Sequence, residues 1–220
     1  MSVPQPIFIL GAPRSFTSVI CAMLGQHPET YGVPELNLFV DETLDQLTQR
    51  LKGIRQFQLH GLLRTVAQLY AGEQTILSVD MAYRWILTRL DKSTGEVYLE
   101  LCRKVAPLRI VYKSPVYVTK PEILKRLHQT FPDAHYLHLV RHPRTQGQSM
   151  AKIANGAIAI MTGSIDYSTK PPTLDPQYSW YKMQSNIVDF LGTIPSHQQM
   201  RLLGEDILNE QKEHFEKIGN

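Results

Sequence analysis

The segment from Pro6 to Ser18 constrains the fold more than any other part of the chain. It reads PIFILGAPRSFTS, an apolar run rich in β-formers followed by a turn with glycine and proline, an arginine and three hydroxyl residues. Unpaired N–H groups at the start of a helix, with the positive end of the helix dipole behind them, bind phosphate-like groups. The segment therefore predicts a strand, an anion-binding loop and a helix, with a phosphorylated or sulfated ligand at the loop.

The loop has the spacing of a Walker A motif but lacks its diagnostic residues. Gly11 and Ser18 stand at the first and last positions of G-x-x-x-x-G-K-[ST]. Phe16 replaces the second glycine, and Thr17 replaces the lysine that reaches the β- and γ-phosphates. A nucleoside triphosphatase would lose its main charge contact, whereas Arg14 supplies a positive charge from within the loop.

The same loop resembles the 5′-phosphosulfate-binding loop of sulfotransferases, Pro-(Arg/Lys)-Ser-Gly-Thr-(Thr/Ser) after a strand. Five residues match: Pro13, Arg14, Ser15, Thr17 and Ser18. Phe16 stands where the family usually has glycine, which leaves the path of the loop open at that residue. The resemblance implies that Gly11 and residues 13–18 bind the phosphosulfate end of 3′-phosphoadenosine-5′-phosphosulfate (PAPS).

A second segment, HYLHLVRHPRTQGQS at residues 135–149, predicts a β-strand, a turn at Pro143 and a helix. It resembles the motif with which sulfotransferases bind the 3′-phosphate of the nucleotide, and this implies contacts from Arg141 and Ser149. A guanidinium gives a bidentate charged contact to a phosphate, and a hydroxyl adds one more donor.

Three further stretches extend the resemblance over nearly the whole chain. Lys113-Ser-Pro and Gly32-Val-Pro-Glu-Leu-Asn-Leu-Phe39 are similar to bacterial sulfotransferases, including domains attached to polyketide synthases, and more distantly to tyrosylprotein sulfotransferases. Residues 180–208 resemble the family's Trp helix, Ile-Pro turn and Tyr-Glu-Asp-Leu segment, with Gly204 in place of the tyrosine.

Members of the family commonly continue with a helix and a basic loop that closes over the 3′-phosphate, whereas this sequence stops at Asn220. Three explanations stay open for this possible lack of a C-terminal lid. The chain is a shortened form, the protein holds its nucleotide in a more open site, or a partner chain completes the lid.

The length of 220 residues suffices for one substantial core, and no linker, charge block or repeat divides the chain. We therefore expect a single sulfotransferase-like domain over residues 1–220. The net charge of +3 is modest and its basic residues are scattered. This argues against a nucleic-acid partner and fits a local anion pocket.

Apolar β-type runs alternate with helical patterns, which is the signature of an α/β fold with a parallel sheet between helices. Strands are predicted at residues 7–10, 109–112, 135–140 and 199–203. Helices are predicted at residues 15–25, 36–52, 59–71, 82–90, 95–106, 120–130, 143–154, 175–191 and 205–218. Ligands of such sheets bind where the strands end, so the loop, Lys113 and Arg141 should share one edge. We expect a mobile loop at 155–176 that shapes the acceptor site.

The two cysteines, Cys21 and Cys102, make a disulfide framework improbable. No signal sequence precedes Pro4, and no apolar run approaches the ~20 residues that span a bilayer. We expect a cytoplasmic protein without membrane association. The eight histidines show no metal-ligand spacing, so no metal is expected.

One residue is available for each catalytic task. Arg14 and the loop amides hold the 5′-phosphosulfate, and Lys113 neutralises the bridging oxygen as the S–O bond breaks. Glu35 is the expected base, because the matching glutamate in related sulfotransferases has been assigned acid–base duty. Some relatives carry a histidine two residues later, where this chain has Asn37. His60, at the predicted start of a helix, is the alternative base.

The sequence thus predicts an enzyme that moves a sulfuryl group from PAPS to a hydroxyl, or less readily an amine, of a small or carrier-bound acceptor. Transfer is expected to be direct and in line, leaving 3′-phosphoadenosine-5′-phosphate (PAP). Two alternatives stay open: a sulfotransferase-like protein that binds nucleotide without catalysis, and a P-loop kinase of a small molecule that uses ATP and Mg²⁺. The sequence does not name the acceptor or the oligomeric state.

Overall fold

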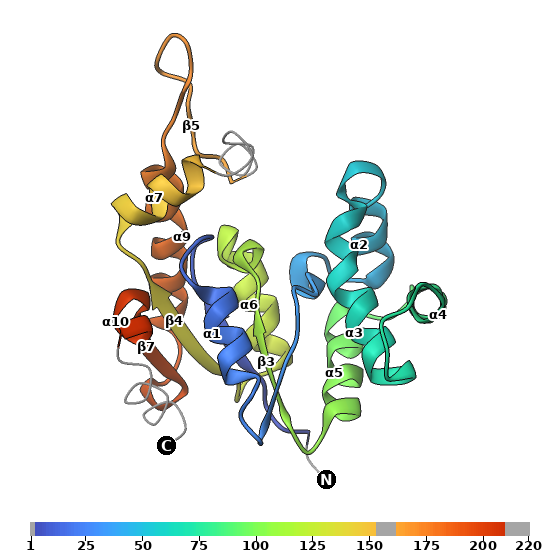
Figure 1. Ribbon diagram of the computed structural model, residues 1–220. Coiled ribbons are helices and arrows are strands. Elements are labelled where there is room, and N and C mark those ends of the chain that lie inside the picture. The colour runs from blue at the N-terminus through green and yellow to red at the C-terminus, as the bar shows by residue number, and fades with distance from the viewer. Residues whose placement is uncertain (1–2, 153–161, 210–220) are drawn as a thin grey trace.

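The computed structural model describes residues 3–152 and 162–209. Its centre is a five-stranded sheet with the order β2-β3-β1-β4-β7, in which every neighbouring pair is parallel (Figure 1). The strands of this sheet are β1 (Ile7–Leu10), β2 (Thr30–Gly32), β3 (Arg109–Lys113), β4 (His135–Val140) and β7 (Gln199–Leu203). A separate antiparallel hairpin pairs β5 (Ile165–Asp166) with β6 (Thr173–Leu174).

Helices connect the strands, as parallel pairing requires. The α-helices of the described residues are α1 (Thr17–Leu24), α2 (Leu44–Arg50), α3 (His60–Ala71), α4 (Ile76–Leu87), α5 (Thr94–Val105), α6 (Pro121–Thr130), α7 (Pro143–Ala151), α9 (Pro176–Leu191) and α10 (Gly204–Asn209). The 3₁₀ helices in the same part of the chain are η1 (Leu38–Val40), η2 (Gly53–Leu59), η3 (Pro115–Thr119) and η5 (Ser196–Gln198).

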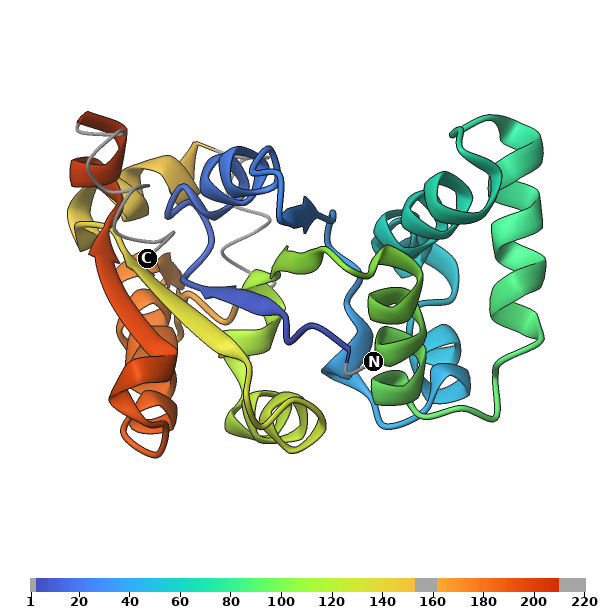
Figure 2. The ribbon, with the colours of Figure 1, turned by 90° about the horizontal axis from the view of Figure 1, so that it is seen from below.

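The sheet is buried on both faces because alternate residues of each strand point to opposite sides. Ile9 and Leu137 belong to an apolar cluster with α1 and α10. Phe8 and Tyr136 belong to a larger cluster with α5, α6 and α9. Figure 2 shows α1 (blue) on one side of the sheet and α6 (yellow-green) and α9 (orange) on the other. The predicted α/β fold, a central parallel sheet between helices, is confirmed.

The four predicted strands are all present, and they differ from the prediction only in that β3 continues to Lys113. The edge strand β2 was not predicted. It has three residues and ends in glycine, which is too short for an alternating pattern to emerge. The hairpin β5–β6 lies within the predicted loop 155–176, whose residues 155–161 lie outside the described part of the chain.

The prediction of one helix over residues 36–52 is wrong. Asn37 has a left-handed φ of 54°, η1 covers only Leu38–Val40, and Asp41 is extended. Helix α2 then starts afresh from Thr43, whose side chain accepts a hydrogen bond from the Gln46 N–H in a capping box. This break turns the backbone before Leu38 so that it lies against the end of β3.

Capping also moves the start of α4 from the predicted residue 82 to Ile76. Thr75 and Ser78 form a capping box there, which outweighs the exposed apolar side chains at Ile76 and Leu77 that obscured the helical pattern. Helix α1 starts at Thr17 rather than at residue 15 because Phe16 is left-handed. The predicted helical residues 153–154 and 210–218 lie outside the described residues.

A buried histidine on β4 makes stability depend on pH. His138 is 2% exposed, and its Nε2 donates to Gln184 Oε1 at 2.6 Å. Burial, the largest cause, and the charge of Arg201 lower the pKa of His138 below its usual 6.5. The unfolded chain therefore binds more protons below pH ~6.5, so the free energy of unfolding falls with falling pH, by at most about 1.4 kcal/mol per pH unit.

Urea unfolding at pH 7.5 and 5.5 measures this effect. The wild type should lose stability between the two values, and His138→Gln should lose less, whatever its own stability at pH 7.5. His135, whose pKa is lowered by burial and by Arg109 and His197, remains in both proteins and accounts for a residual slope. Equal slopes in both proteins would contradict the assignment to His138.

Candidate active site

The loop between β1 and α1 has the geometry of an anion cradle. Arg14 and Phe16 both have left-handed backbones, with φ of 66° and 62°. Helix α1 begins at Thr17 without a side-chain cap, so the N–H groups of its first turn are not consumed within the helix. Gly11 permits a close approach, since a Cβ there would lie 3.0 Å from the carbonyl oxygen of Leu139 on β4.

The residues predicted for the two phosphate ends of the nucleotide lie side by side. Arg14 Nε donates a hydrogen bond to Ser149 Oγ at 3.0 Å, which joins the loop to α7. Arg141 Nη1 donates to the carbonyl oxygen of Arg14 at 2.7 Å, which joins the loop to the end of β4. The structure thus brings Arg14, Arg141 and Ser149 together from two distant segments.

Arg141 is held from several sides. Its guanidinium carbon lies 4.3 Å from the centre of the Phe16 ring, within the range of a cation–π contact. Trp180 Nε1 on α9 donates to the Arg141 carbonyl oxygen at 3.1 Å. Glu205 Oε1 lies 3.8 Å from Arg141 Nε, which is an ion pair at a length beyond a hydrogen bond. Trp180 and Glu205 therefore both help to hold Arg141, the residue predicted to bind the 3′-phosphate.

Around this loop, several buried polar atoms have no hydrogen bond from any described residue. Within residues 3–152 and 162–209 these atoms are Ser15 Oγ, Arg141 Nε and Gln146 Oε1, whereas Gln146 Nε2 donates to the Pro13 carbonyl oxygen at 2.7 Å. Leaving a buried polar atom unpaired costs about 1–3 kcal/mol. The Ser15 hydroxyl, the Arg141 guanidinium and the open N–H groups at the start of α1 can all donate hydrogen bonds to an anion. These residues therefore suit the phosphate and sulfate groups of PAPS.

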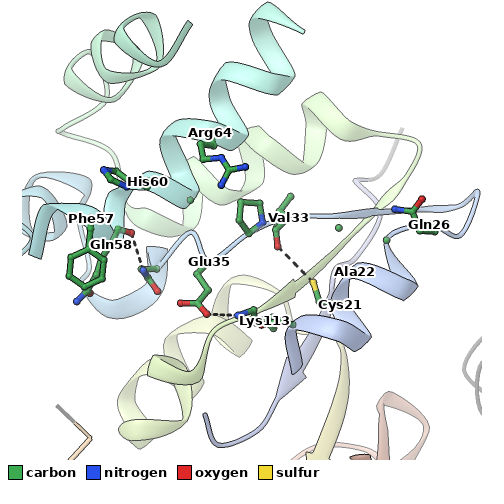
Figure 3. A pocket seen from close by; sticks show the side chains of 16 residues that line it. Cys21, Ala22, Gln26, Val33, Glu35, Phe57, Gln58, His60, Arg64 and Lys113 are labelled. Carbon is green, nitrogen blue, oxygen red and sulfur yellow. Dashed lines mark hydrogen bonds and ion pairs between the residues drawn. The ribbon is translucent and has the colours of Figure 1, made fainter. Parts of the chain in front are cut away.

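A cavity of about 610 Å³ opens beside α1 (Figure 3). Its wall comes from α1, the segment after β2, η2, the start of α3 and the end of β3. Three predicted catalytic residues, Glu35, His60 and Lys113, line it together with Ser18 from the loop. Ser18 therefore connects the anion cradle with the cavity.

Glu35 and Lys113 form an ion pair in this cavity, and Lys113 Nζ donates to Glu35 Oε1 (Figure 3). The Lys113 side chain is 13% exposed and that of Glu35 is 41% exposed. Lys113 is thus fixed at the end of β3, whereas the carboxylate keeps access to the cavity. This is the arrangement expected of a base that meets a substrate beside a buried cation.

The backbone around Glu35 is braced by side chains from β3. Tyr112 Oη accepts the N–H groups of Leu36 and Asn37 at 3.1 and 3.0 Å. Asn37 Nδ2 donates to the Gln58 carbonyl oxygen at 3.0 Å, and Ser114 Oγ donates to Asn37 Oδ1 at 2.9 Å. Asn37, at the position where some relatives have histidine, is a buried link with a left-handed backbone, a conformation that asparagine tolerates well.

The start of α3 lies directly against the backbone of Glu35. A Cβ on Gly61 would come within 1.9 Å of the Glu35 carbonyl oxygen, so only glycine permits this approach. His60, the alternative base, precedes it and is exposed. Figure 3 shows its ring turned away from Glu35 and Lys113. Of the two predicted bases, Glu35 is the one that faces Lys113 in the cavity.

Two residues near the site were missed in the sequence. Arg64 lines the cavity one helical turn after His60, and the i, i+4 spacing on α3 is the signal that would have found it. Gln146, buried beneath the loop, carried no recognisable signal. Cys21 also lines the cavity, but burial raises the pKa of its thiol to about 11, which makes it a poor nucleophile near neutral pH.

Within residues 3–152 and 162–209, no three His, Cys, Asp or Glu side chains are grouped so that they could hold a metal ion. Over the same residues no helix combines the length and the apolar character that crossing a membrane requires.

Known structures share this architecture. The sulfotransferase domain from the curacin biosynthetic pathway is 25% identical, with a TM-score of 0.79, and the alignment covers 99% of this chain and 73% of that one. The sulfotransferase domain of the Synechococcus PCC 7002 olefin synthase is 24% identical, with a TM-score of 0.79 and coverage of 99% and 74%. A sulfotransferase from Alicyclobacillus acidocaldarius, 14% identical, has a TM-score of 0.53 with coverage of 96% and 77%.

No curated protein matches the chain. A family model described as "Sulfotransferase family" matches residues 6–220. This match spans the anion loop, the Glu35–Lys113 pair and the Arg141–Ser149 segment, and the protein therefore belongs to the sulfotransferase family.

Proposed function

We propose that the protein transfers a sulfuryl group from PAPS to a hydroxyl group of a small or carrier-bound acceptor, less readily to an amine. The observation that carries this proposal is the continuity of the anion cradle with the cavity. Ser18 belongs to both, so a sulfuryl group held at the start of α1 would face the cavity in which Glu35 lies.

The nucleotide would be held at both ends by residues that already contact one another. Arg14 and the N–H groups of residues 15–18 would bind the 5′-phosphosulfate. Arg141 and Ser149 would bind the 3′-phosphate, with Phe16, Trp180 and Glu205 keeping Arg141 in place. Arginine suits this task because its planar, permanently charged group matches phosphate geometry.

Glu35 would accept the proton of the acceptor hydroxyl as its oxygen attacks sulfur. The new O–S bond forms while the bond from sulfur to the phosphate oxygen breaks, and Lys113 neutralises the charge that develops on that leaving oxygen. The products are a sulfate ester, PAP and a protonated Glu35. Because Lys113 pairs with Glu35 in the same cavity that Ser18 lines, one cation would serve the resting carboxylate and the leaving group in turn.

The carrier-bound class of acceptor has support from the similar structures. One is a domain from a biosynthetic pathway and another is a domain of an olefin synthase. The sequence of this chain also resembles domains attached to polyketide synthases, and an acceptor bound to a carrier would fit that resemblance. A cytoplasmic location, predicted from the sequence, fits the two buried free cysteines.

A kinase is less well supported. Thr17 stands where a P-loop kinase needs lysine, and it is 5% exposed with no charge to offer. A catalytically inactive nucleotide-binding protein differs from the proposed enzyme in one observable, because it would bind PAP without ever transferring sulfate.

Calorimetric titration with PAP, run beside ATP with Mg²⁺, tests the proposal. We expect micromolar or tighter binding of PAP and little binding of ATP. Arg14→Ala and Arg141→Ala should each weaken PAP binding about 10- to 100-fold, since a hydrogen bond to a charged group contributes about 1.5–3 kcal/mol. Arg144→Ala, an exposed arginine on α7, is the matched control and should bind PAP normally. Preference for ATP would support the kinase, and failure to bind PAP would refute the proposal.

A further inference from the structure

One charge in the cavity has no role in the proposed transfer. Arg64 on α3 lines the same cavity as Glu35 and Lys113. Figure 3 shows its side chain extending from α3 into the space above Glu35 and Val33. Because Glu35 and Lys113 pair with each other, Arg64 gives the cavity a surplus positive charge.

Arg64 is held in place by a series of hydrogen bonds between neutral amide side chains. Its Nε donates to Gln74 Oε1 at 2.7 Å. Gln74 Nε2 donates in turn to Gln68 Oε1 at 3.3 Å, and Gln68 Nε2 donates to the Gly72 carbonyl oxygen at 3.1 Å. These hydrogen bonds anchor the guanidinium to the turn between α3 and α4, so that less side-chain freedom is lost when a ligand binds.

The outer nitrogens of Arg64 are left for a ligand. In the described residues no carboxylate lies within 4.0 Å of its guanidinium, and Glu35, the carboxylate that lines the same cavity, is paired with Lys113. With Nε occupied by Gln74, the Nη1 and Nη2 pair remains, and that pair binds the two oxygens of a carboxylate or phosphate end-on.

We propose that the acceptor carries an oxyanion, a carboxylate or a phosphate, which Arg64 binds while the acceptor hydroxyl lies at Glu35. The inference rests on the proposed function and names the substrate class of the same site. The cavity of about 610 Å³ is large enough for an extended molecule that joins the two groups. The oxyanion can belong to a free hydroxy acid or to a phosphate-bearing tether, and both present the same chemistry to Arg64.

Matched acceptors test the inference. Sulfuryl transfer from PAPS to 8-hydroxyoctanoate is compared with transfer to 8-hydroxyoctanamide, which has nearly the same shape without the charge, and to 8-hydroxyoctyl phosphate. The wild type should favour the anionic acceptors about 10- to 100-fold in kcat/KM, the effect of a charged hydrogen bond. A higher kcat/KM for 8-hydroxyoctanoate would indicate a hydroxy acid as the acceptor, and a higher kcat/KM for 8-hydroxyoctyl phosphate would indicate a phosphate-bearing tether.

Arg64→Gln should reduce this preference to near one while leaving kcat/KM for the amide within about twofold, because the charge acts only on the anion. Arg64→Lys, which keeps the charge without the paired nitrogens, should retain part of the preference. Arg55→Gln, an exposed arginine on η2 outside the cavity lining, should leave the preference unchanged.

A second measurement does not need turnover. Octanoate should bind the PAP complex more tightly than octanamide in calorimetry, and Arg64→Gln should abolish the difference. Equal affinity of the wild type for octanoate and octanamide, or a preference for octanoate that survives in Arg64→Gln, would overturn the inference. Sulfation of the amide together with PAP binding would in that case still uphold the proposed function, whereas loss of both would refute the proposed function itself.

Discussion

Replacing Glu35 by glutamine should lower kcat by about 10²–10⁴-fold, the usual contribution of a general base, while the affinity for PAP stays unchanged. The amide has nearly the shape of the carboxylate, and its oxygen can still accept the hydrogen bond from Lys113 Nζ. The variant therefore keeps the cavity but cannot take the acceptor proton. Sulfuryl transfer under saturating PAPS and PAP calorimetry measure the two quantities.

The control is Glu122→Gln on α6, an exposed acidic residue that does not line the cavity. It changes the net charge of the protein equally and should leave kcat as in the wild type. Full activity of Glu35→Gln would exclude Glu35 as the base and make His60→Gln the next variant to measure. A loss of PAP affinity in Glu35→Gln would show that the substitution had disturbed the loop rather than the chemistry.

The sequence was sufficient to predict which residues meet where the parallel strands end, but not the shape of the cavity beside them. Arg14, Lys113 and Arg141 each lie at or after the carboxyl end of an apolar strand, so parallel strand geometry alone places them at one edge of the sheet. Part of the cavity wall, by contrast, comes from helices and not from the ends of strands. Gly61 and Arg64 lie on α3, and Gly61 packs against the Glu35 backbone next to the point where the predicted helix 36–52 is broken at Asn37.

That break depends on tertiary contacts. Ser114 Oγ and the Gln58 carbonyl oxygen, both distant in sequence, satisfy the amide of Asn37 in its left-handed conformation. No local pattern of apolar residues encodes such a contact, so propensity favoured a continuous helix. The pairing of Glu35 with Lys113 was likewise not predictable from spacing, although both residues were assigned to the site.

Two departures from the family pattern prove to be neighbours. Phe16 stands at the usual glycine of the loop and Gly204 at the usual tyrosine of the C-terminal segment. A Cβ on Gly204 would lie 2.6 Å from Cδ2 of Phe16, so the ring of Phe16 fills space that a side chain at 204 would need. We interpret the pair as one exchange, in which the aromatic ring beside Arg141 comes from the loop instead of from α10.

Gly204→Tyr alone should therefore destabilise the protein and weaken nucleotide binding. The new side chain must displace the Phe16 ring, and overpacking of this kind costs up to about 3 kcal/mol. The Phe16 backbone, at φ 62°, is already in a left-handed conformation, which costs a non-glycine residue about 1–2 kcal/mol. A displacement of its side chain would add to this strain. Thermal unfolding should show the lost stability, and PAP calorimetry should show binding weakened by at least about tenfold.

The double variant Phe16→Gly/Gly204→Tyr should recover most of that loss, since glycine removes both the clash and the backbone strain at position 16 while tyrosine restores a ring. Phe16→Gly alone should cost PAP affinity through the lost contact with Arg141, by about 0.5–2 kcal/mol, and not through stability of the loop backbone. The cycle of four proteins then gives a coupling energy, expected at about 1–3 kcal/mol in favour of the matched pairs. Losses that simply add in the double variant would mean that Phe16 and Gly204 act independently, and that the position of Arg141 does not depend on which segment supplies the ring.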